Sequence, residues 1–195
     1  MKEPIQKRSI ETRNKLMKTA IKLYADKGYH NVTVDEVASS AGLSTGVAYR
    51  YFKNKKDLLL ATIQYAYVNI KDMAHMEDNL FMIFSTEEEK LAYIMDKFVM
   101  LHQKYYDFHE VLEGLKHSDP DVKELYVQIE NSAMDEVINR MKLFLPNENN
   151  LSEKVYLAVS MLETYCHMRL DEQYKMMDFS FVKQEIIRTI VRFRD

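Results

Sequence analysis

The stretch that decides the fold is TVDEVASSAGLSTGVAYRYF, residues 33–52. Thr33, followed three positions later by Glu36, forms a capping box, so a helix is expected to start at the next residue. Gly42 falls where that helix must stop in a left-handed conformation, which glycine adopts most readily. Ser44 offers a second N-cap for a helix of about two turns. Two short helices joined by a glycine turn are typical of a helix-turn-helix, whose second helix enters the major groove of DNA.

A further helix is expected on each side of this motif. Apolar residues recur at helical spacing within residues 13–27. On the other side, Asn54 can cap a helix whose first turn carries Lys55 and Lys56, although the helix dipole disfavours cations there. A bound backbone phosphate would remove this conflict; two solvated lysines are the alternative.

Charge and glycine are unevenly distributed along the chain, whose net charge is −3 over 195 residues. Residues 1–57 hold 12 Lys and Arg against 6 Asp and Glu, whereas the remaining 138 residues hold 15 against 24. A basic N-terminal part can approach phosphates, and an acidic remainder avoids them. Because Gly114 is the only glycine after residue 57, the remainder is predicted to be helical throughout.

Caps and breakers divide that remainder into helices. The expected helices cover residues 54–75, 86–114, 118–145, 152–175 and 178–194. Residues 77–84 are expected to connect the first two, and the second is expected to bend or break around residues 105–108. The last helix is expected to open at Asp178 or Ser180.

No segment indicates a membrane protein, a secreted protein or an enzyme. The start, MKEPIQKRSIETR, lacks the apolar core of a signal peptide, and no apolar run reaches the ~18 residues of a membrane span. The only cysteine, Cys166, permits no internal disulfide and is expected to be a small buried side chain in a cytoplasmic protein. Nucleotide-binding, zinc-protease and serine-hydrolase motifs are absent from the sequence, so neither catalysis nor a cofactor is expected. His102 and His109 have no supporting Cys/His cluster or carboxylate triad, so no metal is expected.

The last two helices are apolar over more than one stripe and therefore need cover on both sides. A body of this size covers one side only, so a second copy of the chain is the simplest partner, and burial inside a monomer is the alternative. The residues expected at this interface are Leu157, Met161, Met168, Ile187, Ile190 and Val191.

The first sixty residues resemble the TetR/AcrR (tetracycline-repressor) family of bacterial transcriptional regulators. The resemblance rests on GYHNVTVDEVASSAGLSTGVAYRYFKNKKDLL, residues 28–59. Thr45 and Val47 depart from the family, which often has lysine at the first position and a small polar residue at the second. The resemblance implies an all-α protein of about nine helices, with a three-helix DNA-binding domain (1–55) and a helical ligand-binding and dimerisation domain (56–195).

The function implied is that of a homodimeric, sequence-specific transcriptional regulator of double-stranded DNA. We expect a repressor that a small apolar or amphipathic effector releases from a near-palindromic operator. The alternative is a helical nucleoid or partner-binding protein that barely distinguishes one duplex from another.

Three sets of residues are assigned to binding. Those expected to read bases are Gly46, Val47, Tyr49 and Arg50, of which Arg50 is best able to hold a guanine edge through two parallel bonds. Those expected to hold phosphates are Thr33, Ser44, Thr45, Tyr51 and Lys55. The resemblance places a ligand cavity among helices that carry Tyr67, Met95, Phe98, His102, Tyr106, Met134 and Tyr165, and plain core is the alternative for each of them.

Overall fold

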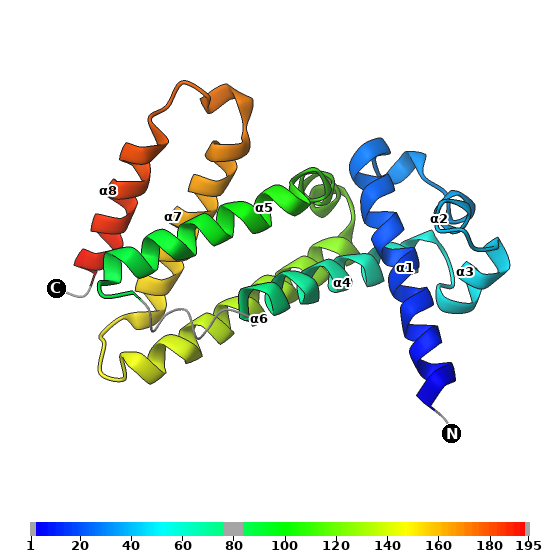
Figure 1. Cartoon of the computed structure of the whole chain (residues 1–195), viewed down its shortest axis with the longest axis horizontal. Coiled ribbons are helices and arrows are strands. Elements are labelled where there is room, and N and C mark those ends of the chain that lie inside the picture. The colour runs from blue at the N-terminus through cyan, green and yellow to red at the C-terminus, as the bar shows by residue number, and fades with distance from the viewer. Residues whose placement is uncertain (1–2, 76–83, 194–195) are drawn as a thin grey trace. The chain divides into compact units, whose positions relative to one another are not determined.

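The computed structural model describes residues 3–75 and 84–193, and within these ranges it contains eight α-helices and no β-strand (Figure 1). The all-α prediction is confirmed. The connection predicted over residues 77–84 lies outside the described residues except for Phe84. By packing, the chain divides into a first unit, Met1–Asp72 with Asp107–Ile129, and a second unit, Met73–Tyr106 with Glu130–Asp195. The functional division at residues 55 and 56 stays a prediction.

The first unit contains the predicted helix-turn-helix. Its elements are α1 (Glu3–Lys27), η1 (Tyr29–Asn31), α2 (Val34–Ser40), α3 (Thr45–Tyr51), most of α4 (Lys55–His75), the end of α5 (Glu87–Ser118) and the start of α6 (Pro120–Phe144). The helix α1 starts ten residues before the expected residue 13. The added residues 3–12 are mostly polar, and Lys7, Arg8, Ile10 and Glu11 are exposed, so hydrophobic periodicity does not reveal these turns.

The caps of α2 and α3 follow the sequence in part. Thr33 Oγ1 accepts the backbone N–H of Glu36 at 3.1 Å, and Gly42 is left-handed with φ 66°. However, the Glu36 carboxylate accepts from Lys27 Nζ at 2.6 Å instead of from the backbone N–H of Thr33. Only one of the two bonds of the capping box is therefore formed. Ser44 is the N-cap residue of α3, as predicted, although its side chain supplies no capping bond.

Aromatic and aliphatic side chains from distant parts of the chain form the core of the first unit. Tyr24 of α1 stacks on Phe108 of α5 with ring centroids 6.5 Å apart, and both are buried. Arg13 lies over the ring of Phe52 at 5.5 Å. Burial raises the pKa of the Tyr24 hydroxyl. The segment that follows residue 106 is thus part of the same core as the helix-turn-helix.

The helix α5 corrects two expectations. It opens on the predicted capping box, in which Glu89 N–H donates to Thr86 Oγ1 and Thr86 N–H to the Glu89 carboxylate, each at 3.2 Å. It is continuous through residues 105–108, although the two units divide there, and it ends at Ser118 rather than near Gly114. A single glycine costs a helix only ~1 kcal/mol, and the stop signal lies at Asp119, which caps α6.

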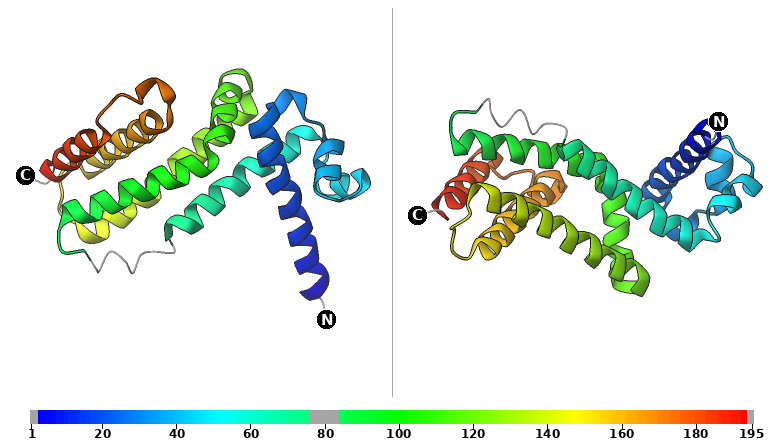
Figure 2. Two further views of the ribbon diagram at one scale, coloured as in Figure 1. Left: turned by 45° about the horizontal axis from the view of Figure 1, so that its top comes forward. Right: turned by 90° about the horizontal axis from the view of Figure 1, so that it is seen from below.

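The second unit packs α7 (Leu151–Leu170) and α8 (Phe179–Arg192) side by side, with η3 (Glu172–Tyr174) between them (Figures 1 and 2). The helix α7 ends five residues before the predicted Lys175 because the Asp171 carboxylate accepts the N–H of Gln173 at 2.9 Å and starts η3. Asp178 caps α8 through the N–H groups of Ser180 and Phe181, so the first of the two predicted caps is used.

Candidate nucleic-acid interface

The helix α3 presents one face to the protein and the other to solvent. Ala48 and Phe52 are buried, whereas Gly46, Tyr49 and Arg50 are exposed, Tyr49 by 50%. Val47, the fourth residue predicted to read bases, is half-buried. The four predicted residues thus lie on the accessible part of the helix, and their base-reading role stays a prediction.

Gly46 stands out on this face because the fold does not require a glycine there. The residue is helical, and no heavy atom lies within 4 Å of the place that a Cβ would occupy. A glycine with open space before it permits close approach of the backbone to a bound molecule. On α3, that molecule would be the edge of a base pair.

Two of the residues predicted to hold phosphates have partners inside the first unit. Tyr51 Oη accepts from Ser9 Oγ at 3.2 Å. Lys55 Nζ donates to the carbonyl of His30 at 3.0 Å and lies 4.4 Å from the ring centroid of Tyr29, and burial lowers the pKa of Lys55. These contacts hold the side chains of Tyr51, the last residue of α3, and of Lys55, the first residue of α4, in defined positions.

The other three predicted phosphate residues differ in exposure. Thr33 and Ser44, the residues before α2 and α3, are exposed, whereas Thr45 is half-buried. Both residues precede the first turn of a helix, whose free backbone N–H groups bind phosphate well. The phosphate role of all five residues stays a prediction.

A second basic surface lies on α1, which the sequence did not reveal as part of the motif. Arg8, Lys15 and Lys22 are spaced seven residues apart, on one side of the helix, and all three are exposed. Lys15 Nζ lies 3.8 Å from the place that a Cβ on Gly42 would occupy, next to the turn between α2 and α3. The positive charge of the motif therefore continues onto α1, where it can meet phosphates.

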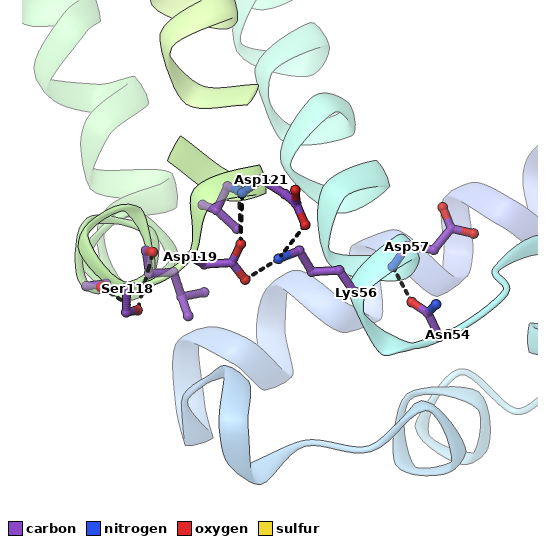
Figure 3. A network of polar contacts seen from close by, with 9 residues as sticks. Asn54, Lys56, Asp57, Ser118, Asp119 and Asp121 are labelled. Carbon is purple, nitrogen blue, oxygen red and sulfur yellow. Dashed lines mark hydrogen bonds and ion pairs between the residues drawn. The ribbon is translucent and has the colours of Figure 1, made fainter. Parts of the chain in front are cut away.

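Lys56 has a different environment from its neighbour Lys55. Its ammonium bonds to the Asp119 carboxylate and lies 3.2 Å from Asp121 Oδ2, at the start of α6 (Figure 3). Asp119 also caps α6 by accepting the N–H groups of Asp121 and Val122. The hydrogen bond from Lys56 holds the pKa of Asp119 below its ordinary value. No local pattern could have revealed this pairing, because 63 residues separate its members.

The predicted ligand-binding residues are spread over both units. Tyr67 lies on α4 in the first unit, and the other six belong to the second. Met95 and Tyr165 are buried with Cys166 in one core cluster, against which Phe98 packs. Tyr106 and Met134 are half-buried, Met134 against a second cluster around Ile138. Burial raises the pKa of Cys166 to about 12, so the thiol stays protonated.

His102 has an unpredicted aromatic partner in His167. The two rings meet edge to face with centroids 5.9 Å apart, and His102 Nδ1 lies 3.0 Å from the carbonyl oxygen of Phe98. Burial lowers the pKa of His102. Among the residues that the structure describes, no group of three or more His, Cys, Asp and Glu side chains is placed to hold a metal ion.

The predicted dimer residues also differ in exposure. Leu157 is 55% exposed, whereas Ile187 is buried in the core of its own unit and Ile190 and Val191 pack against that core. Met161 and Met168 are half-buried. Two exposed apolar residues that the sequence did not single out, Tyr156 on α7 and Phe181 on α8, add to the uncovered surface. Their role in an interface stays a prediction.

No helix in the described ranges is long and apolar enough to cross a membrane.

An exposed two-turn helix after a left-handed glycine, with basic residues on either side, is the arrangement of a helix-turn-helix protein. Residues 16–62 match the family model described as "Bacterial regulatory proteins, tetR family". Over 71 residues the chain is 37% identical to the uncharacterized HTH-type transcriptional regulator YerO of Bacillus subtilis (strain 168). This match covers 36% of the chain and only 25% of that relative.

Solved structures extend the likeness to the whole fold. A putative TetR-family regulator from Mesorhizobium loti MAFF303099 superposes with a TM-score of 0.77 at 12% identity, covering 95% of this chain and 96% of that one. The regulator FadR of Bacillus subtilis, in complex with stearoyl-CoA, superposes with a TM-score of 0.68 at 17% identity, covering 91% and 96%. Residues 16–62 of the chain thus match the tetR-family model, and the whole chain has the fold of these solved regulators.

Proposed function

We propose that this chain is a dimeric, sequence-specific DNA-binding transcriptional regulator, and that it acts as a repressor released by a small molecule. The observation that carries the proposal is the exposed face of α3, where Tyr49 and Arg50 stand beside a glycine that the fold does not require. The match of residues 16–62 to the tetR-family model supports a regulatory role over a structural one.

Selection of bound duplexes from random DNA tests this function. A regulator enriches one short near-palindromic site, whose half-sites lie about one helical turn, 34–36 Å, apart for two symmetric heads. It should bind that site at least ~10³-fold more tightly than random duplex. A nucleoid protein enriches no sequence, and that outcome would replace the proposal with the alternative.

Dimerisation through α7 and α8 is supported by the apolar side chains that these helices leave uncovered. Leu157 and Phe181 are 55% and 60% exposed. Sedimentation without DNA should give twice the mass of the 23.1 kDa chain. A monomer at micromolar concentration would contradict this part of the proposal.

The effector is proposed to be apolar or amphipathic because the predicted cavity residues are mostly aromatic or methionine. The stearoyl-CoA complex of FadR supports this ligand class for a protein of the same fold. The helix α4 carries both Lys55 and Tyr67, so a ligand that shifts this helix would move the DNA-binding residues. Such coupling is typically worth 1–3 kcal/mol and is reciprocal, so operator DNA should weaken ligand binding by the same factor. Calorimetric titration with long-chain acyl-CoA, with and without operator, measures it, and equal affinities would refute the coupling.

A further inference from the structure

Two short-range hydrogen bonds hold the connection between α3 and α4 to the first turn of α4. Phe52 is the C-cap residue of α3, and the next backbone N–H, of Lys53, donates to Asp57 Oδ2 at 2.8 Å. The N–H of Asp57 in turn donates to Asn54 Oδ1 at 2.8 Å (Figure 3). Two of the three residues that connect the helices, Lys53 and Asn54, are therefore bonded to the first turn of α4, which limits how far α3 can shift relative to that turn.

The first turn of α4 is in turn attached to the start of α6 by Lys56. Its ammonium contacts two carboxylates, those of Asp119 and Asp121, and its side chain is 28% exposed. A lysine in the first turn of a helix opposes the helix dipole, whereas aspartates at the start of α6 complement the dipole there. The two ion pairs offset the unfavourable interaction of Lys56 with the dipole of α4, so no bound phosphate is needed to explain a lysine at this position.

We propose that Lys56 is a positioning residue for DNA binding, which fixes α3 and Lys55 against the carboxylates at the start of α6. The inference rests on the proposed function. It divides the roles of two adjacent lysines: Lys55 is proposed to hold a phosphate, whereas the ammonium of Lys56 is held by Asp119 and Asp121. It also implies that residues 107–129, which belong to the first unit although they lie far from the motif in sequence, contribute to DNA binding by positioning α3.

Loss of the Lys56 charge should leave the fold intact. Asp119 keeps its capping bonds to α6, and α4 loses a cation that its dipole disfavours. Since partly exposed ion pairs contribute little to stability, Lys56→Met should melt within about 4 °C of the wild-type protein. A change in DNA affinity then reports position rather than unfolding.

The experiment measures affinity for the selected duplex by fluorescence anisotropy over a salt series. Lys56→Met should bind about threefold to fivefold more weakly, the equivalent of one exposed ion pair, with an unchanged salt dependence. Lys55→Met, the matched control, should reduce the slope of log affinity against log salt by about 1. Lys56→Arg keeps both ion pairs and should bind like the wild type.

The double variant Asp119→Asn with Asp121→Asn separates positioning from bulk electrostatics. Asparagine is also a good N-cap, so α6 is preserved. Removal of two negative charges should tighten DNA binding if charge alone matters, and weaken it if Lys56 needs its partners. Tighter binding by this variant, or a slope that falls equally in Lys56→Met and Lys55→Met, would overturn the inference alone. Failure of the wild-type protein to prefer any duplex would overturn the proposed function and the inference with it.

Discussion

Gly46 offers a variant in which stability and DNA binding should change in opposite directions. Replacement by alanine adds one methyl group to a helical residue that has no heavy atom within 4 Å of the new carbon. Without a clash, the variant gains the usual advantage of alanine over glycine in a compatible backbone, about 0.4–1 kcal/mol. For a chain of this size the melting temperature should rise by about 1–4 °C.

The same methyl group should weaken operator binding. It occupies the space through which the backbone of α3 approaches the base pairs, and a poor fit at one base pair typically costs about 1–3 kcal/mol. Thermal melts and anisotropy titrations on one protein sample give both quantities. The expected result is a more stable protein with an affinity at least about fivefold lower.

Two other glycines provide controls for Gly46→Ala. Gly114→Ala adds a methyl group to α5, again with no atom within 4 Å, so it should stabilise the protein and leave DNA binding unchanged. Gly42→Ala should destabilise it, because Gly42 has φ 66°, where a non-glycine residue costs about 1–2 kcal/mol. If Gly46→Ala bound the operator as tightly as the wild type, α3 would not approach DNA through this residue.

Three further perturbations test the site and the body. Arg50→Ala should lower operator affinity by roughly 1–3 kcal/mol and relax one base position per half-site, which repeated duplex selection would reveal. Leu157→Asp, on an exposed face of α7, should yield folded monomers in sedimentation, whereas a folded dimer would place the interface elsewhere. The lowered pKa of His102 means that the unfolded chain binds the proton more readily, so the free energy of unfolding should fall as the pH drops below about 6.5. Denaturant titrations at several pH values should show a weaker fall in His102→Gln.

The local chemistry of helix ends was the most predictable part of the fold. The bond from Glu36 N–H to Thr33, the left-handed Gly42 and the caps at Asp119 and Asp178 each involve residues within four positions of one another. Such motifs depend only on residues that are close in sequence, so they can be predicted without knowledge of the tertiary packing. The early end of α7 was not predicted, because the Asp171 side chain stabilises a turn by accepting the N–H of Gln173. The apolar pattern of the preceding helix gives no sign of this bond.

Contacts between segments that are far apart in the chain could not be predicted from the sequence, because they depend on how the helices pack. Lys56 and Asp119 meet only because α4 lies beside the start of α6 in the first unit, and His102 and His167 only because α5 lies beside α7 in the second. Each residue taken alone has an ordinary solvated or core interpretation. Two lysines in the first turn of α4 conflict with the helix dipole, and this conflict predicts a nearby anion. It does not predict whether the anion is a phosphate or a carboxylate. The structure supplies carboxylates for Lys56, and a carbonyl and an aromatic ring for Lys55.

The apolar stripes of the last two helices show where periodicity stops being informative. A side chain that faces its own core and one that faces a second copy of the chain are equally apolar, so Ile187 and Leu157 received the same interpretation. Their exposures of 8% and 55% separate them. An aspartate at position 187 would lie among Met95, Leu162 and Cys166, where an unpaired charge costs several kcal/mol and unfolds the second unit. Leu157 is therefore the position at which loss of the dimer can be separated from loss of the fold, and Ile187→Asp serves as the control that fails by unfolding.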